Sequence, residues 1–366
     1  MYKEVGGRKI SASLFLGGSM NYELFKELII SEMKDKNIWD DSYTFKVNKN
    51  IRGQSKSLFI LRDEQKIYIA KYFNYTEDTG IRISRSEWES IKTLNDYIAF
   101  LDENYDVNIE EVSEGLYLKK RCFDRYVLAS KETEDIFPEV YFSIDEVAFD
   151  CSICGILLEK AINGITLEEH INALSSQKKL DRAIQCIDFL TTISHKMYGY
   201  FSKDFVHRDL SPDNIMITES DGKTDYVIID PGVVKIVSRN STRGRVKFCK
   251  DTYSSPEQYL GYGSTVNFTS DIYILGIVIY EYVTGVNLIK KYYRPDILPH
   301  NEINAMLDRT VEDLFFEELE DNTIIDRLYL IIKKMLQCKK EDRFSSPESF
   351  VSVVETLLIK GDDLDD

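Results

Sequence analysis

The sequence lacks a surplus of positive charge. Its 366 residues include 46 Lys and Arg against 62 Asp and Glu, which gives a formal net charge of −16. Because neutralising nucleic-acid phosphates requires clustered Lys and Arg, we expect no nucleic-acid partner. The acidic surplus is otherwise typical of a solvated surface that aids solubility.

A second paired cysteine motif is also missing. Cys151 and Cys154 have the spacing of half a zinc site, whereas Cys186, Cys249 and Cys338 stand alone. A structural zinc site needs a second pair, so this spacing does not predict one. The pair lies in an apolar run that predicts a strand. We therefore expect core cysteines in a reducing compartment.

Long apolar runs are absent as well. The longest, near Ile272 to Val283, is too short to cross a bilayer and contains Glu281. The first ten residues lack the apolar centre of a signal peptide. We therefore expect a cytoplasmic protein with no membrane partner.

What the sequence does contain is a change along the chain from patterns typical of strands to patterns typical of helices. Strand-like segments at 43–51, 58–62, 66–73, 140–144 and 155–159 predict an antiparallel sheet, and helical spacing predicts helices over 22–33 and 84–101. Residues 102–136 match neither pattern. After Gly164 the chain becomes helical, with Thr166 as a predicted helix cap. The sequence thus predicts a small strand-rich part followed by a larger helical part.

One segment carries the chemistry, Val206-His-Arg-Asp-Leu-Ser-Pro-Asp-Asn-Ile-Met-Ile217. Asp209 and Asn214 lie five residues apart on a loop between a helix and a strand, and Asp230-Pro-Gly232 ends a second apolar strand. Phosphoryl transfer needs oxygen ligands that hold Mg²⁺ against the phosphates and a carboxylate that orients the attacking hydroxyl. Asp209, Asn214 and Asp230 supply such a set.

This segment resembles the catalytic loop of the protein kinase family, which reads H-R-D-L-x-x-x-N. The resemblance implies that Asp209 is the catalytic base and that Asn214 and Asp230 are the metal ligands. It implies structural roles for His207 and Arg208.

Other segments resemble the family's nucleotide site. Ile69-Ala-Lys71 is similar to the strand that presents the phosphate-binding lysine. Glu87, which opens E-W-E-S-I-K-T-L, resembles the helical glutamate that pairs with this lysine, and Glu89 is the alternative. Ile51 to Leu58 resembles the glycine-rich loop but keeps only one glycine. The residues implied to bind ATP are Ile51, Gly53, Leu58, Ala70, Lys71, Glu159 and Ala161 of the hinge, and Met216 under the adenine.

Three further matches follow in the family's order. Tyr253-Ser-Ser-Pro-Glu257 resembles the A-P-E segment, and Ser270-Asp-Ile-Tyr-Ile-Leu-Gly276 resembles the helix whose aspartate, Asp271, braces the catalytic loop. Arg343 stands where the family's late arginine pairs with Glu257. If that pair is buried, breaking it is destabilising.

The resemblance covers about residues 44 to 358 and implies an α+β, bilobal protein kinase fold with a small antiparallel-sheet N-lobe and a larger helical C-lobe. The domains expected are an N-terminal extension of unknown role at 1–43, an N-lobe at 44–163, a C-lobe at 164–358 and an acidic tail at 359–366. The implied activity is transfer of the γ-phosphoryl group of ATP, with Mg²⁺, to Ser or Thr of a protein substrate, as in bacterial-type Ser/Thr kinases.

The sequence departs from the family at three places. Ser211 stands where Ser/Thr kinases carry a lysine that stabilises the γ-phosphate. Pro231 replaces the aromatic residue of D-F-G, and Lys250 or Thr252 occupies the place of a Gly-Thr pair before Tyr253. These departures put the rate, the activation switch and the preference for Ser/Thr over Tyr in question.

Two alternatives remain open. A pseudokinase that binds ATP as a scaffold would account for the eroded glycine-rich loop, Ser211 and Pro231. A small-molecule kinase would share the base and the asparagine, but such enzymes generally lack the A-P-E segment. Autophosphorylation is a hypothesis that rests on the hydroxyls between Asp230 and Glu257, which are Ser238, Ser241, Thr242, Thr252, Ser254 and Ser255.

Overall fold

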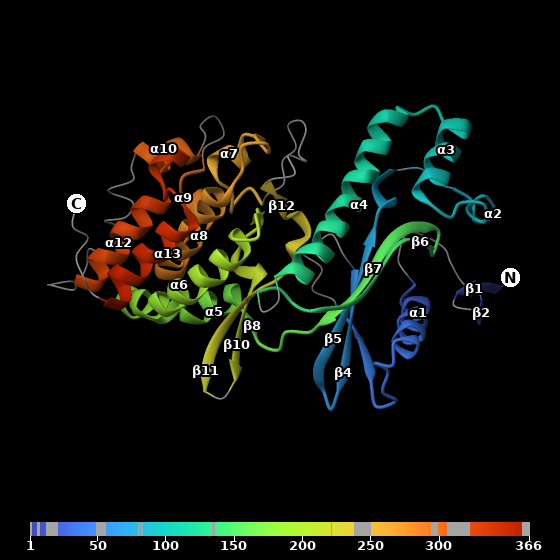
Figure 1. The fold of residues 1–366 in the computed structure, drawn as a ribbon, viewed down its shortest axis with the longest axis horizontal. Helices are drawn as coiled ribbons and strands as arrows, with labels where there is room; N and C mark the ends of the chain where they lie inside the picture. Colours follow the sequence, from blue (N-terminus) through green and yellow to red (C-terminus); the bar gives the residue numbers. More distant parts are fainter. Residues whose placement is uncertain are drawn as a thin grey trace. The chain divides into compact units, whose positions relative to one another are not determined.

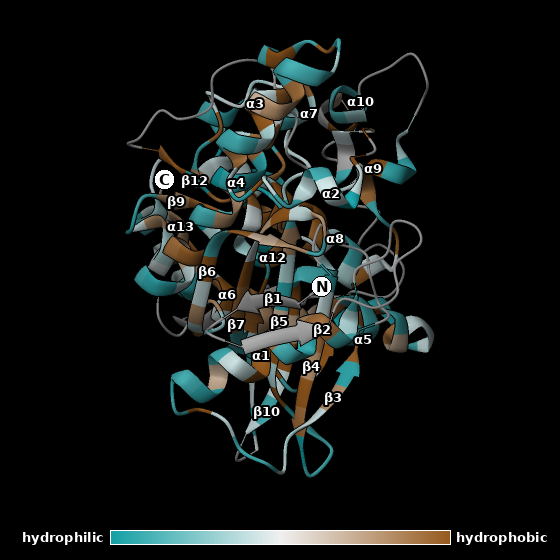
Figure 2. Cartoon of the chain, turned by 90° about the vertical axis from the view of Figure 1, so that its right-hand side faces the viewer, coloured by the Kyte–Doolittle hydropathy of each residue, from teal (hydrophilic) through white to brown (hydrophobic). Residues whose placement is uncertain are grey.

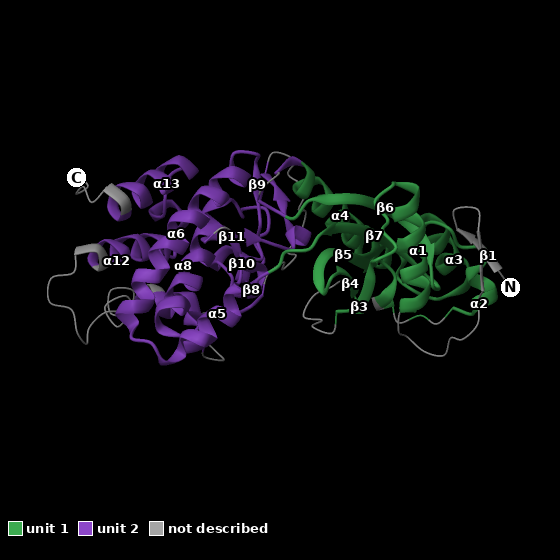
Figure 3. Cartoon of the chain, turned by 90° about the horizontal axis from the view of Figure 1, so that it is seen from below, with its two compact units in different colours: residues 1–131, 138–163 green, residues 132–137, 164–366 purple. Residues whose placement is uncertain are grey.

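The computed structural model describes residues 2–5, 8–11, 21–48, 56–79, 81, 83–133, 136–220, 222–237, 250–293, 299–305 and 323–360. The chain forms two compact units (Figure 3). Unit 1 contains residues 1–131 and 138–163, and unit 2 contains residues 132–137 and 164–366.

Unit 1 is built on a five-stranded antiparallel sheet with the strand order β3-β4-β5-β7-β6. Its strands are β3 (Thr44–Val47), β4 (Lys56–Arg62), β5 (Gln65–Asn74), β6 (Val140–Phe149) and β7 (Ser152–Lys160). A separate hairpin joins β1 (Tyr2–Val5) to β2 (Arg8–Ser11). The predicted meander over 43–73 is confirmed, and its strands pair in sequence order.

Both faces of this sheet are covered by helices (Figure 1). Helix α1 (Tyr22–Asp35) packs Phe25, Leu28 and Ile29 against one face. Helices α3 (Leu94–Asn104) and α4 (Ile109–Glu132) cover the other face. Since successive side chains of a strand point to opposite faces, Tyr72 of β5 packs on the α1 side and Phe73 packs on the side of α3 and α4. In Figure 2, hydrophobic residues run along β4, which contributes to the α1 side of the core.

The structure corrects one helical prediction for unit 1 and adds a helix where the sequence predicted none. The single helix predicted over 84–101 is two helices, α2 (Arg85–Trp88) and α3, because Thr93 begins a new capping box with Asp96. Residues 102–136, which matched no pattern, contain α4, a 24-residue helix. Its apolar side chains are interleaved with charged ones, so neither helical nor strand spacing dominated.

Unit 2 is mainly helical. Its described α-helices are α5 (Leu167–Ala173), α6 (Lys179–Phe201), α7 (Pro256–Tyr259), α8 (Phe268–Thr284), α9 (Leu288–Lys291), α10 (Pro299–Ala305), α12 (Thr323–Met335) and α13 (Pro347–Glu355). Thr166 caps α5 as predicted, through a capping box with Glu169. Helix α8 is buried almost all round, which matches its nearly unbroken apolar sequence.

Short strands in unit 2 position the loops that connect them. β8 (Ile165–Thr166), β10 (Ile215–Ser220) and β11 (Lys223–Ile228) form one sheet, and β9 (Phe205–Val206) pairs with β12 (Lys235–Ile236). Gly222 has a φ of 73° in the turn between β10 and β11, a conformation that glycine adopts without strain.

The cysteine prediction holds only in part. Cys154 is buried in the α1 face of the sheet, but Cys151 is exposed in the turn before β7, so it is not a core residue. Cys249 lies outside the described residues. Among the helices that the structure describes, none is both long and apolar enough to cross a membrane.

Candidate active site

The loop that carries His207, Arg208 and Asp209 is held by a buried carboxylate. Asp271, in the first turn of α8, accepts the backbone N–H of His207 at 2.6 Å and of Arg208 at 2.8 Å. The hydroxyl of Tyr200 donates to the same carboxylate at 3.1 Å. Burial raises the pKa of Asp271 to about 6, and these three donors act in the opposite direction. Asp271 therefore fixes the backbone of the loop at His207 and Arg208.

His207 is part of this support and not an acid or base. Its side chain is fully buried, and burial lowers its pKa to about 4, so the imidazole is neutral. Nδ1 accepts the Asp209 N–H at 3.3 Å, which leaves Nε2 to donate to the Ile229 carbonyl at 3.2 Å. The ring thus joins the catalytic loop to the end of β11.

Asp209 and Asn214 lie in direct contact. The amide nitrogen of Asn214 donates to the Asp209 carbonyl at 2.8 Å and to its carboxylate at 3.1 Å. Burial raises the pKa of Asp209 to about 6, while the positive charge of Lys250 lowers it. Because both hydrogen bonds use Nδ2, the amide is oriented with Oδ1 available as the ligand atom.

Asp230 follows β11 at the same end. The Ile229 N–H donates to the Asn214 carbonyl at 2.9 Å, which brings the chain before Asp230 next to Asn214. Asp230 has a φ of 56° and Arg208 a φ of 69°. Left-handed backbone in residues other than glycine costs about 1–3 kcal/mol and concentrates at functional sites. Arg208 belongs to the catalytic-loop motif and Asp230 begins the Asp-Pro-Gly motif, so both left-handed residues lie in motifs that the sequence singles out.

The residues present fit a magnesium ion. Mg²⁺ prefers carboxylate and amide oxygens and commonly uses one or two protein ligands together with substrate phosphates. Asn214 and Asp230 provide that donor set. In the part of the chain that the structure describes, no group of three or more His, Cys, Asp or Glu forms a metal site on its own. The donor set therefore suits a metal that arrives with phosphate oxygens.

In unit 1, the partner of Lys71 is not the one that the sequence predicts. The Lys71 ammonium lies 2.8 Å from the Glu159 carboxylate and donates to the Tyr126 hydroxyl at 2.6 Å. Tyr126 in turn donates to Glu159 at 2.7 Å, and all three side chains are buried. Glu87 is exposed on α2, where it closes a capping box with Ser84. The predicted Lys71–Glu87 pair is thus corrected to Lys71–Glu159.

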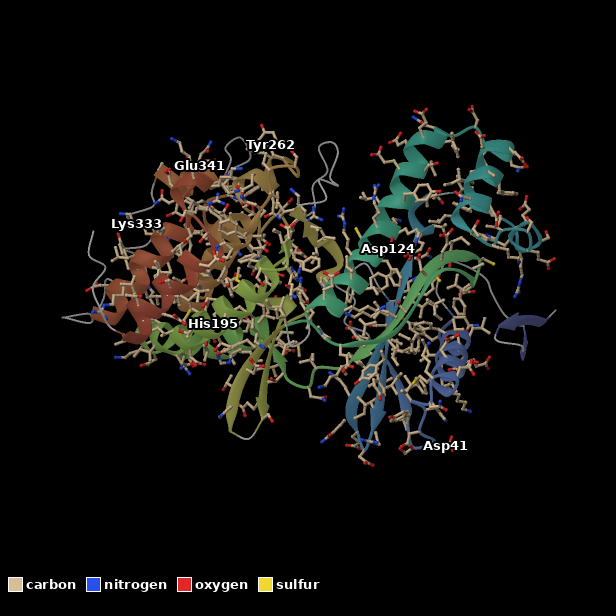
Figure 4. All side chains as sticks on the ribbon, in the orientation of Figure 1. Asp41, Asp124, His195, Tyr262, Lys333 and Glu341 are labelled. Atoms are coloured by element: carbon tan, nitrogen blue, oxygen red, sulfur yellow. The ribbon has the colours of Figure 1, made fainter. Side chains whose placement is uncertain are left out.

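The alternative, Glu89, is the exposed C-cap residue of α2. The helix that packs over Lys71 is α4, and it presents the phenol of Tyr126 there. Asp124, labelled on α4 in Figure 4, lies 3.5 Å from Lys120 of the same helix. Sequence reasoning missed Tyr126 because α4 was not recognised as a helix.

Strand register also changes the predicted nucleotide-binding set. Lys71 lies on the sheet face of α4, whereas Ala70 and its cross-strand neighbour Leu58 lie on the opposite face, packed with α1. The residues that share the face of Lys71 by alternation are Ile69 and, across from it on β4, Phe59. A shift of one residue moves a strand's side chains to the other face. Ala70 and Leu58 thus lie on the other face of the sheet from Lys71, and their contact with the nucleotide stays a prediction.

The other residues that the sequence predicts to bind ATP lie on different elements of the two units. Glu159 is the buried partner of Lys71, and Ala161 follows β7 with its N–H bonded to the Ile67 carbonyl at 3.0 Å. Met216 lies on β10 of unit 2, half-buried. Ile51 and Gly53 lie outside the described residues.

Glu257 and Arg343 form a buried ion pair. The guanidinium donates to the two carboxylate oxygens at 2.9 and 3.2 Å. Although burial acts to raise it, the charge and hydrogen bonds of Arg343 hold the pKa of Glu257 below its usual value. The pair ties α7 to the segment before α13.

Lys250 reaches the catalytic loop from the segment before α7. Its ammonium donates to the Ser211 hydroxyl at 2.8 Å and to the Asp213 carboxylate at 2.8 and 2.9 Å. Although burial acts to raise it, Lys250 holds the pKa of Asp213 below its usual value. Ser211 and Lys250 both depart from the family pattern in the sequence, and the fold brings them into contact.

The comparisons with known proteins agree with this arrangement. The protein kinase domain family matches residues 151–354, more than half of the 366 residues, so the chain belongs to this family. Its fold is the protein kinase fold, with an antiparallel N-terminal sheet and a mostly helical remainder. The kinase domain of PknI from Mycobacterium tuberculosis is similar in structure, with a TM-score of 0.50 and 14% sequence identity over 87% of this chain and 96% of that one.

Proteins with similar sequences include bacterial kinases named as serine/threonine kinases and one named as a tyrosine kinase. Serine/threonine-protein kinase Pkn1 of Myxococcus xanthus is 25% identical over 185 residues, which is 47% of this chain and 24% of that protein. Tyrosine-protein kinase MasK of Myxococcus xanthus is 33% identical over 155 residues, which is 42% of this chain and 22% of that protein. The matches therefore span about a quarter of the length of these two relatives.

Proposed function

We propose that this chain is an ATP- and Mg²⁺-dependent protein kinase that transfers the γ-phosphoryl group to Ser or Thr hydroxyls of proteins. The observation that carries the proposal is the contact between Asn214 and Asp209 on a loop braced by Asp271. An unused site has no physical reason to keep a partly buried carboxylate, an oriented amide and two left-handed residues together.

The residues divide the work as the chemistry requires. Asp209 accepts the proton of the attacking hydroxyl and orients its oxygen. Asn214 and Asp230 hold Mg²⁺, which neutralises charge on the phosphates when it is bound. Lys71, fixed by Glu159 and Tyr126, binds the nucleotide phosphates. We assign the N-lobe of the kinase to unit 1 and the C-lobe to unit 2.

The preference for Ser or Thr rests on Pkn1 and other bacterial relatives named Ser/Thr kinases, while MasK is named a tyrosine kinase. Autophosphorylation is part of the proposal, but fewer hydroxyls can take part than the sequence suggests. Ser254 and Ser255 are fully buried, whereas Thr252 is partly exposed. Ser238, Ser241 and Thr242 lie outside the described residues.

The test is transfer from γ-labelled ATP with Mg²⁺ to casein, to the chain itself and to an aminoglycoside. Wild type is compared with Asp209→Asn and Lys71→Met. Label on protein Ser or Thr that both substitutions abolish is the expected result. Label on the aminoglycoside alone would establish a small-molecule kinase. Tight ATP binding without transfer to any acceptor would establish a pseudokinase.

A further inference from the structure

The catalytic loop lacks a cation where its chemistry needs one. At the transition state of phosphoryl transfer, negative charge is spread over the non-bridging oxygens of the γ-phosphate, and a nearby cation stabilises it. Ser211, two residues after Asp209, supplies a hydroxyl and no charge. The Ser211 side chain is fully buried, so the hydroxyl is a fixed group within the loop.

The structure places an ammonium group against this hydroxyl. Lys250 donates to Ser211 Oγ at 2.8 Å, although the two residues are 39 positions apart in the chain. Ser211 is itself tied to the site, since its carbonyl accepts the Asn214 N–H at 2.9 Å and Asn214 binds Asp209. The ammonium of Lys250 is therefore one hydrogen bond from the loop that holds the base.

The backbone of Lys250 is anchored so that this position is reproducible. Its carbonyl accepts the Tyr253 N–H at 2.9 Å, and the two residues form a β-bridge. The Tyr253 hydroxyl donates to Glu281 of α8 at 2.6 Å, and Asn287 donates to the same carboxylate at 3.0 Å and to the Thr252 carbonyl at 3.1 Å. This turn is fastened to the buried helix α8.

The ammonium is also open to a ligand. The Lys250 side chain is 32% exposed, in contrast to the fully buried Ser211 that holds it. Asp213 and Ser211 hold the ammonium in place, and a phosphate oxygen that approaches its exposed side can compete for one of its N–H donors.

We propose that Lys250 is the catalytic cation of this kinase and that Ser211 is its positioning residue. The segment before α7 thus supplies the ammonium, and the catalytic loop supplies the hydroxyl that holds it. The inference rests on the proposed function. During transfer, the acceptor oxygen forms a bond to the γ-phosphorus and its proton passes to Asp209. The bond from phosphorus to the bridging oxygen breaks, and its electron pair leaves with ADP. Lys250 stays protonated and donates to the γ-phosphate oxygens.

The experiment measures kcat and KM for ATP with casein as acceptor. The variants are Lys250→Gln, which keeps hydrogen-bonding capacity but removes the charge, and Lys250→Met. Both are expected to lower kcat by about 10²–10³-fold with little change in KM, as for loss of one charge-stabilising donor. Lys339→Met, at an exposed lysine before the 3₁₀ turn Lys340–Asp342, is the control and is expected to match wild type.

The decisive variant is the double substitution Lys250→Met with Ser211→Lys, which puts the ammonium back on the loop. We expect it to recover at least about tenfold in kcat over Lys250→Met, because the same charge then reaches the phosphate from the other side of the pair. A merely structural lysine predicts no recovery, since the double variant also lacks the original contact. Melting temperatures of all variants separate loss of folding from loss of rate.

Two results overturn the inference alone: kcat of Lys250→Gln within about threefold of wild type, or a double variant that folds but recovers nothing. Both require an active wild type whose activity Asp209→Asn abolishes, so the proposed function stands in either case. A wild-type chain that transfers phosphate to no acceptor overturns the proposed function and this inference with it.

Discussion

Replacing Arg343 by methionine should destabilise unit 2 severely. The guanidinium makes two bonds to Glu257 and three more to the carbonyls of Gln337, Cys338 and Thr269, at 2.8, 2.9 and 3.0 Å. Its loss leaves a carboxylate buried in α7 with the Ser270 hydroxyl as its remaining side-chain donor in the described structure. Methionine fills part of the space but satisfies none of these groups.

The size of the effect follows from this burial. Removing one partner of a buried ion pair costs about 3–5 kcal/mol, because the other charge stays buried and uncompensated. For a unit of about 200 residues, 1 kcal/mol shifts the melting temperature by roughly 2–4 °C. The expected drop is thus about 6–20 °C. Since domains are stable by only about 5–15 kcal/mol, much of the stability of unit 2 depends on this pair.

The effect should depend on pH with a definite sign. The pKa of Glu257 lies below its usual value in the folded chain, so the pair stabilises the chain fully above the ordinary carboxyl pKa of 4.5. This contribution is lost as the pH falls through the lowered pKa of the folded state. In Arg343→Met the buried carboxylate instead takes up a proton. The difference in stability between wild type and variant should therefore shrink below about pH 4.5.

The assay is thermal unfolding followed by circular dichroism at pH 7 and at pH 4. The matched control is Glu355→Gln, which breaks an exposed pair with His195, labelled in Figure 4, at 3.1 Å. The control should change stability by less than about 1 kcal/mol. If Arg343→Met changes stability no more than Glu355→Gln does, the pair does not support the fold and the argument from burial is wrong.

Three further predictions concern buried polar groups. Glu159→Gln should lower the melting temperature by several degrees because it removes the carboxylate that pairs with the buried Lys71 ammonium, whereas Glu87→Gln, at an exposed position, should leave the melting temperature nearly unchanged. Equal effects of the two substitutions in thermal unfolding would contradict the Lys71–Glu159 pairing. Asp271→Asn should cost about 1–3 kcal/mol, since the two loop N–H groups bind different carboxylate oxygens and the amide replaces one of these oxygens with an NH2 donor. Hydrogen exchange should show those backbone amides opening first. Lys235→Met should be destabilising by a similar amount, because the buried ammonium donates to three carbonyls; urea unfolding with an unchanged midpoint would contradict this.

The sequence alone determined the features that depend on neighbours in the chain. The segment from His207 to Asn214 is local: its base, amide and turn residues occupy adjacent positions, so the spacing was enough to predict the chemistry. The meander at 43–73 was predictable for the same reason, since alternation along a strand is a short-range pattern. Family membership followed from these local motifs and from their order.

Tertiary structure decided which distant side chains meet. Lys71 pairs with the buried Glu159, which is 88 positions away on β7, and no spacing in the sequence specifies that pairing. Strand parity puts Ala70 and Lys71 on opposite faces of the sheet, and only the covering helices show which face is which. In the sequence, Lys250 and Ser211 each appear as the loss of a residue that the family carries at that position. Folding of the segment before α7 onto the loop brings the charge of one to the hydroxyl of the other.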